Sequence, residues 1–164
     1  ARGRADRAAY RFTSGDRSRW VDWRGGERFV ISGSKVKRVA GSPRPNTHAS
    51  FRRWLDLIFT YAGTTSLARD TPAPANETPV EAGDFFVDPG SPGHAVIVLD
   101  IAEDGDGQRL ALIAQGFMPA EEVHILTSDG ATDGRWFRLP ERSTDLLDTP
   151  SWTPFEQSSR RRFP

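Results

Sequence analysis

Cysteine is absent from this sequence of 164 residues. Its absence excludes disulfide bonds, thiolate metal ligands and a cysteine nucleophile, so any covalent catalysis would need serine, threonine or another group. No apolar run approaches the roughly 18 to 20 residues that span a bilayer, and we expect no transmembrane segment. Histidine is scarce as well, and the 3 histidines lack the spacing of a metal site. We therefore predict neither a metal nor a cofactor.

Lysine is almost absent, since 20 of the 22 basic residues are arginine. Residues 1–53 hold 14 Lys and Arg against 4 Asp and Glu, whereas residues 54–164 hold 8 against 18. One interpretation is that the two oppositely charged halves attract each other across the fold. The other interpretation is that the basic residues line a groove that binds nucleic acid. Because the basic residues lack the aromatic and glycine-rich signatures of nucleic-acid modules, we expect no nucleic-acid partner.

The strongest helix signal follows a Pro/Gly-rich break at residues 41–46. Apolar side chains recur there at helical spacing, at Phe51, Trp54, Leu55, Ile58, Phe59 and Ala62. The pattern predicts a helix from about residue 48 to 62. Thr47 or Ser50 can cap its start, and Gly63 stands where a helix commonly ends.

Strand signals lie on both sides of this helix. Residues 27–39 carry β-branched side chains around a Ser-Gly-Ser tip, which is typical of a hairpin. Apolar runs at 83–87, 94–102 and 109–117 are separated by turn sequences and predict adjacent antiparallel strands. The elements together predict an α+β fold in which one main helix packs on an antiparallel sheet. We expect the residues from 127 onward to form an extended tail held by aromatic side chains.

Several stretches of the chain match a known family in order and spacing. They are RFTSGD at 11–16, SFRRWLDLIFTYAGTTSL at 50–67, GDFFVDPGSPGHAVIVLDIA at 83–102 and LIAQGFMPAEEVHIL at 112–126, followed by a C-terminal WTPF element. With these motifs, which cover nearly the whole chain, the sequence resembles the bacterial family of domain of unknown function 4846. Its members are longer proteins, often with export or lipoprotein signals. The resemblance implies a location in the cell envelope, the periplasm or outside the cell, and no established activity.

The same resemblance implies that the chain is the C-terminal part of a longer protein. Its length fits a single domain over residues 1–164. We divide this domain into a basic front portion at 1–46 that contains the hairpin, a helix-plus-sheet core at 47–126 and the extended tail at 127–164.

A second resemblance concerns the papain-like cell-wall peptidases of the NlpC/P60 and CHAP type. In those enzymes a helix that begins with the nucleophile ends in an Ala-Gly pair, a Gly-Asp pair opens the next strand, and the base opens the strand after that. Here the helix ends in Ala62-Gly63, the next strand opens with Gly83-Asp84, and His94 opens the following one. The resemblance implies a papain-like core and hydrolysis of amide or acyl bonds. The nucleophile position falls at Ser50 or Phe51, neither of which is cysteine.

The candidate catalytic residues are Ser50, His94 and Gln115. A hydroxyl at a helix N-terminus lies where backbone N–H groups and the helix dipole stabilise an oxyanion, so Ser50 could attack a carbonyl carbon. It would need a base within about 3 Å, which His94 could supply, and the amide oxygen of Gln115 could hold the imidazole in the right tautomer. The alternatives are that Ser50 only caps the helix, that His94 bonds the turn at 88–93, and that Gln115 bonds a loop backbone.

Thr13, Ser14 and Arg28 belong to the basic front portion and could line a cleft that binds a carboxylate. Capping of a turn is the alternative for Thr13 and Ser14. Ser91 and Gly93 precede the candidate base and complete the candidate substrate-binding residues. Two functions remain open. One is an amide or acyl hydrolase or transferase that acts on cell-wall peptides, and the other is a non-catalytic domain that binds a peptide, a glycan or a partner protein.

Overall fold

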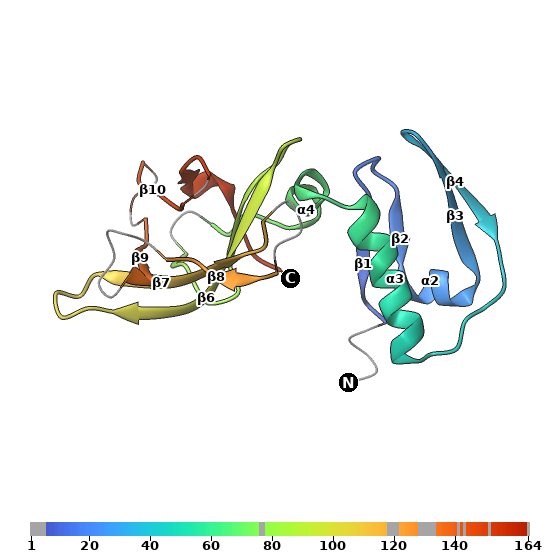
Figure 1. Ribbon diagram of the computed structural model, residues 1–164, viewed down its shortest axis with the longest axis horizontal. Coiled ribbons are helices and arrows are strands. Elements are labelled where there is room, and N and C mark those ends of the chain that lie inside the picture. The colour runs from blue at the N-terminus through green and yellow to red at the C-terminus, as the bar shows by residue number, and fades with distance from the viewer. Residues whose placement is uncertain are drawn as a thin grey trace. The chain divides into compact units, whose positions relative to one another are not determined.

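The protein is described by a computed structural model in which the chain forms two compact units, residues Ala1–Asp70 and Thr71–Pro164. Each unit is described on its own below (Figure 1). The structure describes residues 6–75, 78–117, 122–127, 134–140, 142, 144–150 and 152–163.

The first unit combines two antiparallel strand pairs with helices. In chain order its elements are β1 (Ala9–Arg11), β2 (Arg17–Arg19), α2 (Trp20–Gly25), β3 (Glu27–Ser32), β4 (Lys35–Ala40), α3 (His48–Tyr61) and α4 (Thr64–Asp70). Strand β1 pairs with β2, and β3 pairs with β4. Gly26 ends α2 with φ +119°, and a Cβ there would lie 2.4 Å from the carbonyl oxygen of Gly41. Only glycine fits this close approach of the two backbones.

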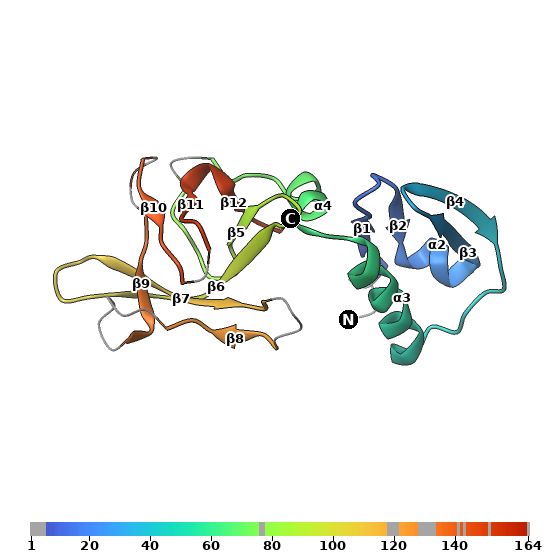
Figure 2. The ribbon, with the colours of Figure 1, turned by 45° about the horizontal axis from the view of Figure 1, so that its top comes forward.

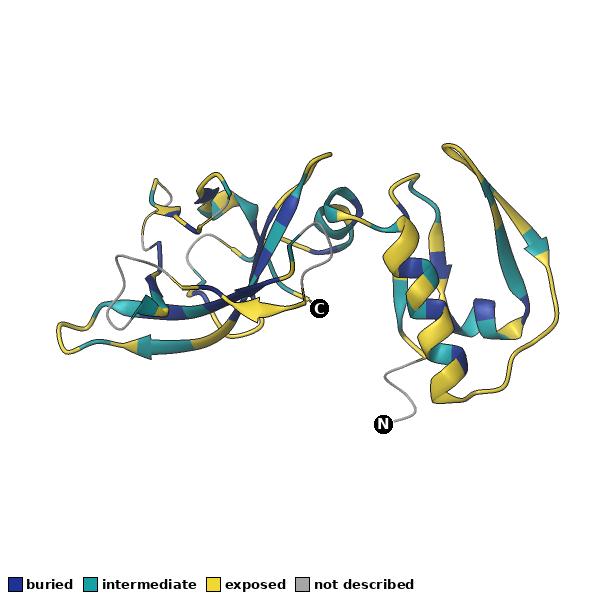
Figure 3. Cartoon of the chain, viewed as in Figure 1, coloured by how far each residue is buried: buried dark blue, intermediate teal, exposed yellow. Residues whose placement is uncertain are grey.

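Aromatic side chains form the core of the first unit. Helix α3 presents Trp54 and Ile58, one helical turn apart, to this core, and its opposite side is exposed (Figure 3). The indole N–H of Trp54 donates to the hydroxyl of Ser18 at 2.9 Å, so both buried polar groups are paired. The buried members of this cluster are Phe12, Trp20, Trp23, Trp54 and Ile58.

The second unit is built around an antiparallel sheet with the strand order β12-β5-β6-β7-β8, and β9 also pairs with β7. Figure 2 shows the two longest strands, β6 and β7, crossing the unit. Strands β10 and β11 form a separate pair, and a short 3-10 helix η2 precedes β12. The bounds are β5 (Phe85–Asp88), β6 (His94–Glu103), β7 (Arg109–Gln115), β8 (His124–Ile125), β9 (Trp136–Arg138), β10 (Leu146–Leu147), β11 (Phe155–Glu156), η2 (Gln157–Ser159) and β12 (Arg160–Arg161).

The core of the second unit comes from its own strands and from its C-terminal segment. Alternate side chains of β6 are buried. Two of them, Val96 and Val98, pack with side chains of β7 such as Ile113. The other buried members are Val80, Phe86, Ala111, Leu126, Phe137, Leu139, Leu147 and Phe155. The C-terminal residues therefore complete this core and add strand β12 to the sheet.

The predicted fold class is wrong. The chain is mostly β, with several antiparallel sheets, and it is not the α+β papain-like arrangement of one main helix on a sheet. Helix α3 forms almost where the periodicity predicts it, but its apolar face packs on the aromatic cluster of the first unit. Helical spacing predicts that one face of the helix will be buried. It does not predict which other side chains cover that face, because this depends on how closely their shapes fit, and here the rings of Phe12, Trp20 and Trp23 cover it.

The division between the two compact units falls after Asp70, inside the segment 47–126 that the sequence assigns to a helix-plus-sheet core.

Within the described part of the chain, no helix is long and apolar enough to cross a membrane.

Candidate functional site

His94 and Gln115 meet at one end of the sheet in the second unit. Strand β6 begins at His94 and the antiparallel strand β7 ends at Gln115, so the antiparallel pairing brings the two residues to the same end of the sheet. Nε2 of His94 lies 2.6 Å from Oε1 of Gln115, and both side chains are buried. The sequence analysis names His94 through the resemblance to NlpC/P60 and CHAP peptidases and Gln115 as the group that could hold its imidazole.

The hydrogen bond identifies Nε2 as a donor. An amide oxygen can only accept, so Nε2–H of His94 donates the hydrogen bond to Oε1 of Gln115. Among the described residues, Nδ1 has no hydrogen-bond partner. The ring is enclosed by Phe117 and Trp152, at centroid distances of 5.1 and 5.0 Å, with Phe155 at 6.3 Å. These contacts hold the imidazole in one orientation.

Asp88 connects this pair to the surface. It lies directly opposite His94 in the β5–β6 ladder and is exposed. Its carboxylate accepts a hydrogen bond of 3.1 Å from the indole N–H of Trp152, the same side chain that packs on the His94 ring. The imidazole, the indole and the carboxylate thus form one continuous set of contacts.

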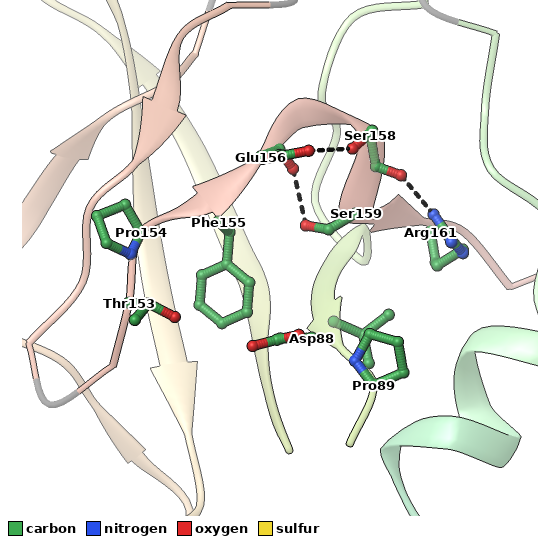
Figure 4. Close-up of a pocket in the computed structure, with 10 residues that line it drawn as sticks. Asp88, Pro89, Thr153, Pro154, Phe155, Glu156, Ser158, Ser159 and Arg161 are labelled. Carbon is green, nitrogen blue, oxygen red and sulfur yellow. Dashed lines mark hydrogen bonds between the residues drawn. The ribbon is translucent and has the colours of Figure 1, made fainter. Parts of the chain in front are cut away.

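A pocket of about 430 Å³ lies beside this set (Figure 4). Phe155 forms one wall, and Asp88 and Glu156 contribute carboxylates. The polar groups are held by the chain itself, because Oε2 of Glu156 accepts from the Ser158 hydroxyl at 2.9 Å, and Nη1 of Arg161 donates to the Ser158 carbonyl at 2.8 Å. The remaining lining residues are Val87, Pro89, Thr153, Pro154 and Ser159.

Ser50 belongs to the first unit, near the start of α3. Thr47 is the N-cap of this helix, and its hydroxyl accepts from the backbone N–H of Ser50 at 3.3 Å and donates to the Ser50 hydroxyl at 3.2 Å. Ser50 is therefore part of the capping arrangement, which is the structural role that the sequence leaves open for it. The neighbouring Phe51 ring contacts Trp20 and Trp54 in the aromatic cluster.

Thr13 and Ser14 line a different pocket, within the first unit. Ser14 donates to the Asp16 carboxylate at 2.9 Å and so also caps its own turn. Arg28 does not line this pocket. Its guanidinium donates to the carbonyls of Trp23, Glu27 and Ser42 and lies 4.7 Å from the Trp23 ring centre.

Arg28 is half-buried and links α2 and β3 to the segment that follows β4. Burial, and secondly the positive charge of Arg44, lower the pKa of its guanidinium. Ser91 and Gly93 lie in the turn before His94, where the Ser91–Pro92 peptide bond is cis. Neither residue lines the pocket beside Asp88.

A buried ion-pair cluster escaped the sequence analysis. Asp84 is almost fully buried and accepts from Nε and Nη2 of Arg162 at 2.5 and 2.8 Å. The hydrogen bond to Asp84 raises the pKa of Arg162, whereas burial lowers the pKa of its neighbour Arg160. The signals were the Gly-Asp pair before β5 and the run of three arginines at 160–162. The cluster attaches the C-terminal segment to β5 and is structural.

Metal ligation finds no support in the described part of the chain, where no group of three His, Cys, Asp or Glu side chains could hold an ion.

Comparison with known proteins gives one result. No curated protein and no solved structure matches the chain, so the resemblance to NlpC/P60 and CHAP peptidases gains no support from relatives. A family model described as "Domain of unknown function (4846)" matches residues 1–162. The chain therefore belongs to the DUF4846 family, as its motifs predict.

Proposed function

We propose that the second unit is a binding domain for a small polar ligand that carries a free amine. The observation that supports this proposal is the pocket of about 430 Å³, within the volume range of small-molecule sites. Its polar side chains are already held by hydrogen bonds within the chain, so ligand binding would cost less conformational entropy in these side chains.

The charges of the lining favour an amine. Asp88 and Glu156 contribute two carboxylates. Arg161 is the one cation among the described lining residues, and its Nη1 donates to the carbonyls of Ser158 and Arg160. An ammonium group would gain charge-assisted hydrogen bonds with the carboxylates. The hydroxyls of the pocket could bond amide groups, and the Phe155 ring could contact an apolar side chain. A short peptide with a free amine fits this combination, and cell-wall peptides, one of the substrate classes that the sequence analysis leaves open, contain such amines.

The test is a calorimetric titration of the full chain with purified amine-containing cell-wall peptides and with the same peptides after N-acetylation. We expect saturable binding that acetylation of the amine weakens at least tenfold. Asp88→Asn keeps an acceptor for the Trp152 indole but removes the charge, and it should weaken binding about tenfold. Asp106→Asn, an exposed carboxylate outside the pocket, is the matched control and should bind like the unmodified protein. Equal affinity for acetylated peptides, or binding of neutral glycans alone, would contradict the proposal.

A second candidate function is hydrolysis of an amide or acyl bond, and the observation that favours it is the 2.6 Å contact between His94 and Gln115. In this candidate His94 acts as the general base, and the sequence hypothesis names the Ser50 hydroxyl as the nucleophile. The Gln115 amide accepts from Nε2–H and keeps the imidazole in the required tautomer.

Incubation with cell-wall sacculi and a mixed peptide library, read by mass spectrometry, separates the two candidates. Products that disappear in both His94→Ala and Ser50→Ala would establish the hydrolase. Binding without any product from the folded protein would leave the binding domain as the function. Products that persist in Ser50→Ala but not in His94→Ala would support His94 as the base and would show that Ser50 is not the nucleophile.

A further inference from the structure

The first unit contains a second pocket, of about 400 Å³, that the function proposed for the second unit does not use. It lies between the turn that joins β1 to β2, the tip of the β3–β4 hairpin and the end of α3. Its lining residues are Phe12, Thr13, Ser14, Ile31, Gly33, Ser34, Val36 and Tyr61. In Figure 1 the two hairpin tips of this unit point the same way, toward the top of the view.

The walls of this pocket are apolar and fixed. Phe12 is buried, and its ring meets Phe29 and Tyr61 edge to face, at centroid distances of 5.1 and 5.8 Å. Ile31 and Val36 face each other across the β3–β4 ladder and are only half-buried. The backbone N–H of Thr13 donates to the carbonyl of Tyr61 at 2.8 Å and ties the β1–β2 turn to α3. An apolar side chain could enter without rearranging these groups.

The charge around the pocket contrasts with its neutral lining. Residues 1–70 carry 15 Lys and Arg against 6 Asp and Glu, a net charge of +9 for the first unit. Arg17 follows the β1–β2 turn and Lys35 follows the hairpin tip, and both are exposed. A field of this sign attracts anionic partners and repels cationic ones.

The adjoining backbone favours a peptide over other anions. Strands β3 and β4 form a two-stranded sheet, and in the part of the chain that the structure describes neither is hydrogen-bonded to a further strand. An extended peptide could therefore pair with a hairpin edge while one of its side chains enters the pocket.

From the pocket, the charge and the open edges we infer that the first unit binds an acidic peptide segment through one bulky apolar side chain. The apolar side chain acts as the anchor, and acidic residues on both sides of it meet the basic rim.

The test uses the full chain and a fluorescent peptide, acetyl-Asp-Glu-Leu-Glu-Asp-amide, followed by anisotropy and by ¹⁵N chemical shifts. We expect saturable binding with shifts at the backbone of Thr13, Ser34 and Val36. Replacing the central leucine with alanine should weaken binding about tenfold, because most of a buried leucine side chain is lost. Replacing the acidic residues with lysine should abolish binding, and added salt should weaken the original peptide.

Protein variants separate the local site from net charge. Lys35→Glu at the rim should weaken binding at least threefold, whereas Arg53→Glu on the exposed side of α3 changes the net charge equally and should have a smaller effect. Thr13→Trp should block the pocket and abolish binding while the circular dichroism stays unchanged. Equal effects of Lys35→Glu and Arg53→Glu, indifference to the central leucine, or binding of anionic vesicles in place of the peptide would each overturn the inference.

Discussion

Asp84→Asn is expected to destabilise the second unit by about 3 kcal/mol. The Asp84 carboxylate accepts from Nε and Nη2 of Arg162 and, at 3.1 Å, from the backbone N–H of Glu81. Arg160 is 2% exposed, and its Nη1 lies 3.9 Å from Oδ2 of Asp84. Removing one partner of a buried ion pair leaves an uncompensated charge and costs about 3 to 5 kcal/mol. Asparagine keeps the volume and one acceptor oxygen, so we place the loss at the lower end.

Urea unfolding followed by circular dichroism measures the loss, and hydrogen exchange assigns it to a unit. With a urea dependence of about 1 to 3 kcal/mol per molar, a loss of about 3 kcal/mol lowers the midpoint by about 1 to 3 M. Amides of β5 and β12 should exchange faster, and those of α3 should not change, because Asp84 and its partners Arg160 and Arg162 belong to the second unit.

The matched control is Asp56→Asn. Asp56 accepts from Arg52 at 2.9 Å on the exposed side of α3, and such a surface pair is worth about 0.5 kcal/mol or less. Similar midpoints for Asp84→Asn and Asp56→Asn would refute the conclusion that the buried cluster holds the C-terminal segment in place.

Three smaller changes test other contacts. Thr47→Ala removes the N-cap of α3 and should cost the first unit about 1 kcal/mol in urea unfolding; an unchanged midpoint would show that Thr47 is not needed as a cap. Trp152→Phe keeps an aromatic ring but removes the N–H bonded to Asp88, and calorimetry should show a threefold or greater loss of peptide affinity without lower stability. Trp54→Phe leaves the buried hydroxyl of Ser18 unpaired and should cost about 1 to 3 kcal/mol, and adding Ser18→Ala to that variant should recover part of the loss.

Local elements were largely predictable from the sequence. The helix predicted at 48–62 is α3, and the hairpin predicted at 27–39 is β3–β4. The strands predicted at 94–102 and 109–117 are β6 and β7, which begin at the predicted residues. Side-chain periodicity and turn residues act over a few neighbouring positions, so they are visible without knowledge of the fold.

The candidate site was predicted only in part. The His94–Gln115 contact follows from two strands that are adjacent in sequence, since an antiparallel connection brings the start of one beside the end of the other. Ser50 was joined to this pair by resemblance to enzymes of another fold, and the structure assigns it a contact with the N-cap Thr47. The pocket beside Asp88 was missed because most of its lining comes from residues 153–161, which carry no regular pattern.

The sequence by itself determined the family, the position of the main helix and strands, the absence of thiol chemistry and the charge contrast between the two parts of the chain. Tertiary structure decided which core α3 joins, how the C-terminal segment adds β12 to the sheet and where the pockets lie. The physical reason is range. Periodicity and composition are properties of neighbouring residues, whereas contacts such as Asp84 with Arg162, 78 positions apart, depend on shape and charge matching that appear only once the chain has folded.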